Sequence, residues 1–421
     1  MHTRTRRTLP GLATALISAA LVLTTAPAQA ARMPLSSSTD TPVNTTTGAP
    51  IVVTTNGYGH GHGMSQWGAK GAADAGLSTQ QILSFYYPGT SLGGLPPSTG
   101  IKVLITADTD NNLTVYPARG LRVRDLGNGR TYKLRHTKRT PRLWRLVQKN
   151  GHTKVFYRTS RWHLYKTAGR RSLAGDGEFR APGGTTLKLR TGPKKYRGAL
   201  RFTNRDTVNV LNLEKYVRGV IAAESPASWP AAALGAQAVA ARTYAVRERA
   251  DNAGGYYDIC DTAACQVYGG VGMEKDTTNA AAAATAGQVL MAPDGTYAFA
   301  QFASSNGGWS SAGSQPYLIA QADPYDLAAA PYHHRQKQVD PSKLQAAYPQ
   351  IGTLTSVQIM KRENSTTPAE WGGWVQTVRL AGTNGVTPTA VDISGDDFRR
   401  VYGLRSAYFT FALPFDPSST P

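Results

Sequence analysis

The sequence predicts an α+β fold, in which a β-rich stretch is inserted in or adjoins a mixed helical and β core. Apolar and polar residues alternate between turn signals from Ile101 to about Leu213, a period of two that is typical of half-buried strands. From Leu213 onward the apolar residues recur every three or four positions, which is the period of one helical face. No internal repeat is visible, so the two patterns together indicate mixed structure.

The first 30 residues have the pattern of a secretory signal peptide, in which arginines precede a short apolar run and a small-residue cleavage site. The apolar run ends near Thr25, which makes it too short for a comfortable membrane span, and Ala28-Gln29-Ala30 follows it. No later run reaches spanning length. We therefore expect a secreted protein, located outside the cell or in the cell wall.

Two polar segments flank the expected core. Residues 31–50 are rich in threonine, so we expect a disordered linker there and ordered structure from about Ile51. Residues 416–421 are expected to form a flexible tail after a core that spans residues 201–415.

The run GYGHGHGMSQWGAKGAADAG, residues 57–76, cannot be regular structure in its first part because glycine alternates with larger residues. The β-branched residues Ile51–Thr55 before it predict a strand. Helices are predicted from Ser65 to Ala75 and from Thr79 to Tyr86, the second being stopped by Pro88. The glycines would let backbone N–H groups approach a ligand. The alternative is a tight strand-to-helix connection without a ligand.

Residues 101–200 carry nearly all of the positive charge. They contain 24 Lys and Arg against 5 Asp and Glu, a net +19 of the formal +20 of the chain. Such an excess implies a polyanionic neighbour, which for a secreted protein is an anionic cell-wall polymer. A merely soluble basic surface is the alternative. No zinc-finger, RNP or helix-turn-helix pattern occurs, so no nucleic-acid partner is predicted.

Local patterns predict several elements within and after this basic stretch. LRVRDLGNGRTYKLR reads as a hairpin that turns at Gly127-Asn128-Gly129. LEKYVRGVIAAE from Leu213 is a helix, and a second, alanine-rich helix begins near Pro230 and ends at Asn252. A third helix is expected from Asn279 to Ala286, followed by a hairpin of QVLMA and YAFAQFA.

Glu224 is the first candidate for chemistry. It ends an apolar helix beside Ala222 and Ala223, and Pro226 interrupts the chain after it. Apolar surroundings favour the neutral carboxyl group and raise its pKa, which suits a general acid near neutral pH. The alternative is an ordinary surface glutamate at a helix end.

The stretch EKYVRGVIAAESPASWPAAALGAQAVAARTYA, residues 214–245, resembles the core of the SpoIID/LytB family, named after stage II sporulation protein D. The likeness continues through YDICDTAACQVYGG, ATAGQVLMAPDGTYAFAQFASSNGG and DDFRRVYGLRSAYF. The resemblance implies a lytic transglycosylase that cuts peptidoglycan between N-acetylmuramic acid and N-acetylglucosamine and leaves 1,6-anhydro ends, with Glu224 as the catalytic residue. The family also includes amidase enhancers, so the rival is a non-catalytic peptidoglycan-binding or amidase-activating module.

The glycine-rich run resembles the GHGxGMSQ motif, which members of this family carry near their C-terminal end. In this chain the motif comes first, so the order of segments is that of a circular permutation. The resemblance implies that residues 51–100 pack on the core, that the strand Ile51–Thr55 lies beside the strand Tyr408–Leu413, and that His60 approaches Glu224. His60, Ser65 and Gln66 are then candidates for binding the glycan or orienting Glu224.

Some family members bind zinc in the loop that holds Cys260 and Cys265, through a histidine where this chain has Ala264. Two thiolates alone do not complete a tetrahedral site, so a disulfide is favoured, zinc is disfavoured and no cofactor is expected. The same loop and the run SSNGGW supply further candidates for substrate binding: Asp261, Gln266, Tyr268, Ser304 and Ser305. The expected partners are glycan strands of peptidoglycan, an anionic wall polymer and a partner amidase.

Overall fold

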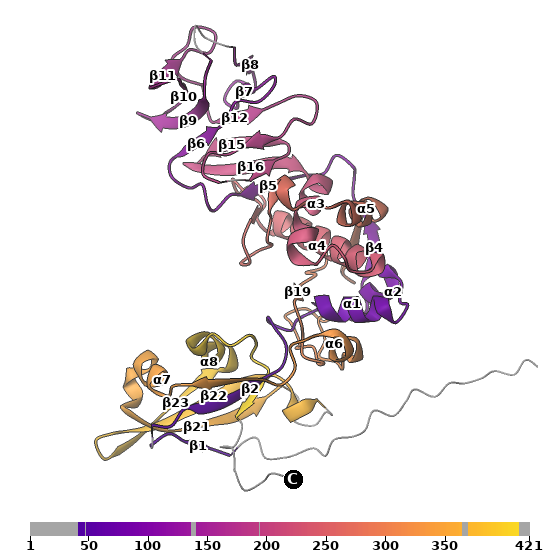
Figure 1. The fold of residues 1–421 in the computed structure, drawn as a ribbon, viewed down its shortest axis with the longest axis vertical. Coiled ribbons are helices and arrows are strands. Elements are labelled where there is room, and N and C mark those ends of the chain that lie inside the picture. The colour runs from indigo at the N-terminus through magenta and orange to yellow at the C-terminus, as the bar shows by residue number, and fades with distance from the viewer. Residues whose placement is uncertain (1–40, 47, 136–139, 193, 364–368, 412–421) are drawn as a thin grey trace, which may run out of the picture. The chain divides into compact units, whose positions relative to one another are not determined.

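The computed structural model describes residues 41–46, 48–135, 140–192, 194–363 and 369–411 (Figure 1). The expected signal peptide, most of the expected linker and the expected tail lie outside these residues. The α+β prediction is confirmed, because helices and strands are mixed along the chain.

A seven-stranded sheet joins the basic stretch to the segment that follows it. Its order is β17-β5-β16-β15-β12-β7-β8, and all neighbours are antiparallel except β17 and β5. The predicted turn at Gly127-Asn128-Gly129 is confirmed by the β7–β8 pairing. The boundary expected at residue 200 falls inside β15, so the two regions share one sheet. The strands are β5 Gly100–Leu104, β7 Arg122–Asp125, β8 Thr131–Lys133, β12 Gly177–Arg180, β15 Ala199–Thr203, β16 Asp206–Asn212 and β17 Ile259–Cys260.

A four-stranded antiparallel sheet, in the order β11-β10-β9-β6, completes the β-rich region. One of its faces is buried in the same apolar core as the larger sheet, through residues such as Trp144, Leu146 and Val155. A two-stranded ladder of β13 and β14 lies in the same region of the chain. The strands are β6 Asn112–Val115, β9 Leu143–Lys149, β10 His152–Arg158, β11 Trp162–Tyr165, β13 Leu187–Lys188 and β14 Lys195–Tyr196.

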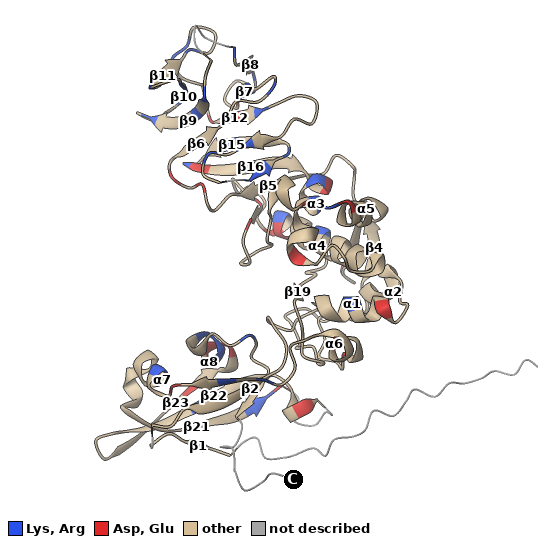
Figure 2. Ribbon diagram, in the orientation of Figure 1, with Lys and Arg blue, Asp and Glu red and all other residues tan. Residues whose placement is uncertain are grey.

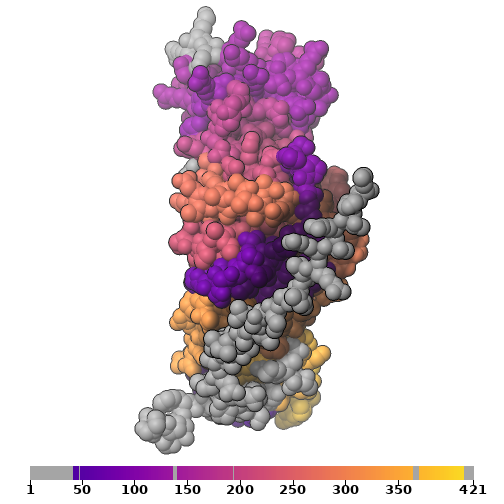
Figure 3. Space-filling model, turned by 90° about the vertical axis from the view of Figure 1, so that its right-hand side faces the viewer, coloured from indigo at the N-terminus to yellow at the C-terminus, as the bar shows by residue number. Residues whose placement is uncertain are grey.

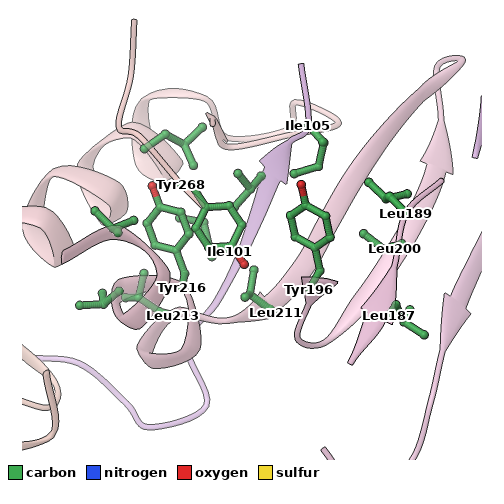
Figure 4. Close-up of a cluster of buried hydrophobic side chains, with 14 of the residues drawn as sticks. Ile101, Ile105, Leu187, Leu189, Tyr196, Leu200, Leu211, Leu213, Tyr216 and Tyr268 are labelled. Atoms are coloured by element: carbon green, nitrogen blue, oxygen red, sulfur yellow. The ribbon is translucent and has the colours of Figure 1, made fainter. Parts of the chain in front are cut away.

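Three helices pack on this core: α3 Leu213–Glu224, α4 Ala231–Asp251 and α5 Asp276–Ala284. The side chain of Asn212 caps α3 by accepting from the N–H of Glu214, and the apolar face read from the sequence is buried. Figure 4 shows Tyr216 of α3 beside Tyr268 within this apolar cluster. A short helix, η1 Gly270–Met273, follows the loop that carries Tyr268.

The early residues pack on α4 and on segments much later in the chain. Helices α1 Gln66–Asp74 and α2 Thr79–Tyr86 share a buried cluster with α4, and in the space-filling view their indigo surface adjoins pink residues from the middle of the chain (Figure 3). Strand β3 Met64–Ser65 pairs in parallel with β19 Phe302–Ala303. A further short helix, α6 Pro324–Ala329, contacts α1.

The hairpin expected after α5 forms next to its turn but does not extend further. Residues 296–298 pair with the end of β18 Gln288–Met291 through a bridge between Met291 and Tyr297 and through backbone hydrogen bonds of Ala298 to Leu290 and of Ala292 to Thr296. Strand β4 Ser91–Gly94 pairs with the whole of β18. Local sequence therefore predicted the turn and the start of the hairpin correctly, but it contained no signal for β4, which lies nearly 200 residues earlier.

The C-terminal residues form two further sheets, in the orders β1-β21-β22-β23 and β20-β2-β24. Strand β2 Ile51–Thr55 pairs antiparallel with β24 Phe409–Phe411, as the sequence predicted. The expectation of an unpacked linker fails near its end, because β1 pairs with β21 and Thr45 is buried. The remaining elements are β1 Val43–Asn44, β20 Arg335–Val339, α7 Ser342–Ala347, η2 Pro349–Ile351, β21 Thr353–Arg362, η3 Glu370–Gly372, β22 Val375–Asn384, β23 Thr387–Ser394 and α8 Gly395–Tyr402.

The β2–β24 pairing predicts that the chain tolerates a change in the order of its segments. Val53 lies opposite Phe411, so the first residues of β2 are beside the end of β24. A variant that runs from residue 98 to residue 421 and continues directly with residues 41–97 keeps every described strand pairing. We expect it to unfold cooperatively, with a midpoint within about 10 °C of the unpermuted chain. Circular dichroism during heating measures this, and an unfolded permutant would contradict it.

Candidate active site

Glu224 is placed at the last position of α3 because the helix cannot continue past it. Ser225 adopts an extended conformation with φ −136° and ψ 137°, and Pro226 follows. A carboxylate at a helix C-terminus faces the negative end of the helix dipole, which disfavours its ionised form. The side chain is only partly buried, so it keeps some exposed surface.

Two donors from distant segments meet the Glu224 carboxyl group. The backbone N–H of Val267 donates to Oε1 over 2.9 Å, and Nε2 of Gln66 lies 3.3 Å from Oε2. Burial raises the pKa of Glu224, while these two hydrogen bonds act in the opposite direction. The group therefore holds its proton to a higher pH than a solvated glutamate and can donate it to a substrate.

Gln66 is the residue of the glycine-rich run that reaches Glu224. It is the first residue of α1, it is 6% exposed, and its Nε2 also lies 3.4 Å from Oε1 of Gln237 on α4. Of the two roles expected for Gln66, binding the glycan or orienting Glu224, the contact with Glu224 is compatible with the second. The Gln66 amide lies between Glu224 and Gln237, and this contact on each side fixes its rotamer for the interaction with Glu224.

The loop after β17 holds the Val267 amide in place. On either side of Val267, Gln266 and Tyr268 are each 1% exposed and bonded inward. The Gln266 side chain accepts from the Tyr216 hydroxyl over 3.0 Å and donates to the carbonyl of Ala241 over 3.1 Å. These contacts fix the backbone between Gln266 and Tyr268. The polar side-chain atoms of both residues bond to protein groups and are buried, so they are not available to a substrate.

Asp261 has a similar internal role. It is 5% exposed, and its Oδ1 accepts from the N–H and hydroxyl of Thr106. The sulfur atoms of Cys260 and Cys265 are joined in a disulfide within the same loop. Across the described residues, no group of three or more His, Cys, Asp and Glu side chains is arranged to hold a metal ion.

Asp326 organises the residues behind Gln66. Its side chain is 0% exposed and accepts from the hydroxyl of Ser65 over 2.5 Å, from the hydroxyl of Ser305 over 2.9 Å and from the N–H of Gly308 over 3.0 Å. Ser65 also caps α1 by accepting from the N–H of Gly68. Both serines are thus positioning residues in this structure, and the sequence reasoning missed Asp326 altogether.

Ser304 differs from Ser65 and Ser305 because it is only partly buried. Its carbonyl accepts the N–H of Trp67 over 3.0 Å, which links the SSNGGW run to the residue after Gln66. Among the candidates from this run, Ser304 therefore has the more accessible side chain.

His60 does not contact Glu224. It stacks on His62, with ring centroids 5.0 Å apart, and its Nδ1 accepts from the N–H of His62. Both histidines line a separate cavity of 490 Å³, which Trp374 and Arg399 also line and Glu224 does not. Gly61 has a φ of +76° and is packed against the Trp374 ring, so a larger residue would not fit there. The predicted approach of His60 to Glu224 is therefore wrong.

Aromatic rings gather near the Gln66 end of the site. The rings of Trp67 and Trp229 meet edge-on with centroids 5.1 Å apart, and Tyr332 lies 6.4 Å from Trp67. All three residues are partly exposed. Trp67 could have been found from the sequence, because it directly follows Gln66, whereas Tyr332 carries no local signal.

Comparison with known proteins finds similarity in the segment that contains Glu224 and Val267. Residues 202–291 match the family model described as SpoIID, stage II sporulation protein, a stretch that contains Glu224 and Val267. The chain is similar to the amidase enhancer of Bacillus subtilis (strain 168), with 41% identity over 116 residues, which are 26% of this chain and 15% of that protein. It is also similar to stage II sporulation protein D of the same organism, with 49% identity over 45 residues, or 11% of this chain and 13% of that protein.

These matches cover less than a quarter of either relative, so the similarity concerns one part of each protein. In the part of the chain that the structure describes, no helix is both long and apolar enough to cross a membrane.

The Gln66 contact predicts a change in the titration of Glu224. Replacing Gln66 by Leu removes a donor that stabilises the carboxylate, so the pKa of Glu224 should rise further. Titration of ¹³C-labelled glutamate carboxyl groups by NMR measures this, with the Glu224→Gln protein used to assign the resonance. An unchanged or lower pKa would show that the amide does not stabilise the ionised form.

Asp326 should matter for stability more than an exposed carboxylate does. Asp326→Ala leaves the buried hydroxyl groups of Ser65 and Ser305 without the carboxylate that accepts from them, so the free energy of unfolding should fall by about 3 kcal/mol or more. Asp74→Ala on α1, which removes an exposed ion pair with Lys70, is the matched control and should cost less than about 1 kcal/mol. Urea unfolding compares the two variants, and equal losses would disprove the role given to Asp326.

Proposed function

We propose that this protein is a secreted lytic transglycosylase that cleaves the bond between N-acetylmuramic acid and N-acetylglucosamine in peptidoglycan. The observation that carries the proposal is the partly buried Glu224 carboxyl group, whose pKa is raised by burial and which Val267 and Gln66 hold in one orientation. A cell-wall function is supported by the family match over residues 202–291 and by the name of the amidase enhancer relative.

One carboxyl group suffices for this reaction. Protonated Glu224 donates its proton to the glycosidic oxygen as the bond to the leaving sugar breaks. The resulting carboxylate then takes the proton of the C6 hydroxyl of the muramyl sugar, whose oxygen attacks C1 and closes the 1,6-anhydro ring. Because the nucleophile is tethered to the reacting sugar, effective molarity can lower the barrier by about 7–11 kcal/mol.

The surroundings of Glu224 fit this chemistry better than hydrolysis by two carboxylates. A hydrolase of the usual kind needs a second carboxyl group facing the same bond. Asp258 and Asp261, the acidic residues nearest in the loop, accept backbone and side-chain hydrogen bonds from Lys102 and Thr106 and are buried. The partly exposed rings of Trp229 and Trp67 support the proposal, because aromatic side chains stack on sugar rings in carbohydrate sites.

A non-catalytic role as an amidase enhancer is the second candidate, and the name of the Bacillus subtilis relative with 41% identity favours it. In that case the glycan would bind at the same aromatic site and a partner amidase would perform the cleavage.

We also propose that residues 101–200 bind an anionic polymer of the wall, and that the order of segments is a circular permutation of that in the family. The pairing of β2 with β24 supports the permutation.

The test is incubation of the chain from Ala31 to Pro421 with purified peptidoglycan, both intact and stripped of stem peptides. Mass spectrometry should detect 1,6-anhydro ends, and Glu224→Gln should reduce their formation by at least about 10³-fold, because an amide cannot donate the proton. Glu248→Gln on α4 is the matched control and should keep the activity. The rate should fall as pH rises through the raised pKa of Glu224, since only the protonated form starts the reaction.

The products separate the alternatives. Reducing ends without anhydro sugar would indicate hydrolysis and contradict the transglycosylase. Retained glycan binding without any cleavage, by either protein, would favour the amidase enhancer.

A further inference from the structure

The sheet β11-β10-β9-β6 has a second face, opposite the one buried in the apolar core, and its positive charge has no role in the proposed cleavage reaction. The register places Arg145 opposite Phe156 and Arg158 opposite both Leu143 and Trp162, all on the side away from the buried Trp144 and Val155. The strands β9, β10 and β11 hold no acidic residue, and they show blue without red in Figure 2. We call this surface the basic face, formed by Arg145, Lys149, Lys154, Arg158, Phe156 and Trp162.

The carboxylates of the region do not neutralise this face, because most of them are turned inward. Of the five acidic residues among residues 101–200, Asp108, Asp125 and Glu178 are at most 2% exposed. Asp125 accepts from the backbone of its own turn and of Gly175, and Glu178 pairs with Arg180 and Arg201. Asp176 accepts from Thr203. Only the fifth, Asp110, is exposed, so the surface carries fewer accessible negative charges than the composition alone implies.

No cation of the basic face has an ion pair within the described residues. Burial, followed by the neighbouring charge of Arg190, lowers the pKa of Arg145, and Arg158 acts in the same direction. The charge of Asp110 acts on Arg145 in the opposite direction, but it forms no ion pair with Arg145, so the cations of the face remain close together. A bound anion would relieve this repulsion.

The aromatic rings of the face are covered by cations. The guanidinium carbon of Arg145 lies 4.1 Å from the centroid of the Trp162 ring, that of Arg158 lies 6.0 Å from it, and Nζ of Lys149 lies 5.4 Å from the Phe156 centroid. Cations thus already lie against these rings, which makes the rings less available for the base stacking on which single-strand binding depends. The strands β9, β10 and β11 also expose none of the large apolar side chains that insert into a membrane.

We infer that the basic face binds a linear polymer of phosphodiester groups that carries no bases, such as a polyol phosphate of the cell wall. Guanidinium groups bind phosphate oxygens through two parallel hydrogen bonds, and several cations along neighbouring strands can contact successive phosphates. This inference deepens the proposed function and rests on it for the location at the wall. It assigns the anchoring to one face of residues 101–200.

The experiment titrates the chain from Ala31 to Pro421 with synthetic poly(glycerol phosphate) of about ten repeats at several salt concentrations. The triple variant Arg145→Gln/Lys154→Gln/Arg158→Gln should bind at least about tenfold more weakly at 50 mM salt, with a salt slope smaller by about two. The control Lys215→Gln/Arg249→Gln/Lys343→Gln removes the same charge from exposed positions elsewhere, and it should bind within about twofold of the parent.

Further arms keep the test decisive. Arg145→Lys/Arg158→Lys keeps the charge and should lose less affinity than the triple variant. Lys149→Gln/Lys154→Gln replaces the triple variant if the latter does not fold. Equal losses in the control, binding that does not depend on salt, or tighter binding to poly(dT) or to phosphatidylglycerol vesicles would overturn the inference.

Cleavage separates this inference from the proposed function. Peptidoglycan freed of phosphate polymers should be cleaved equally by the parent and the triple variant, whereas Glu224→Gln should bind the polymer normally and not cleave. Loss of polymer binding with intact cleavage would thus be a failure of the anchor alone.

Discussion

The two hydrogen bonds to the Glu224 carboxyl group are the interactions on which the site depends. Their donors come from residues 66 and 267, so they form only after α1, the disulfide loop and α3 have packed together. Each donor has its own support: Gln66 rests against Gln237 and beside the Ser65–Asp326 bond, and the Val267 amide lies between the anchored Gln266 and Tyr268. The buried polar residues around the site are explained by this need for a fixed geometry.

The sequence predicted the elements whose signals are local. Helix α2 was bounded correctly, because Ser78 and Gln81 form a reciprocal capping box at its start. Helix α3 and the β7–β8 hairpin were likewise readable from period and turn residues. The pairing expected for strand β18 was incomplete: the hairpin forms next to its turn, but the second partner β4 lies nearly 200 residues earlier and its sequence SLGG has no strand signal. Such pairing is decided by tertiary packing.

The site divides in the same way. Glu224 and Gln66 belong to motifs that could be recognised, and the structure brings them together. Ser65 and Ser305 were predicted to bind substrate because they are polar residues in a recognisable motif. Their burial could not be predicted, because it depends on the distant Asp326, whose buried carboxylate accepts from both hydroxyl groups. His60 shows the converse limit. The glycine on either side of it allows several backbone directions, and packing against Trp374 decides which one is used.

A raised pKa alone does not identify the acid in this protein. Burial and the charge of Asp326 raise the pKa of Asp323 to about 6, and burial also raises the pKa of Asp326. Both carboxyl groups are 0% exposed, and Tyr86 and Asn306 donate to Asp323, so no glycosidic oxygen can reach either proton. Glu224 combines the raised pKa with exposed surface and with only two donors. Access to substrate therefore selects Glu224 among the buried carboxyl groups, and the others stabilise the framework that presents it.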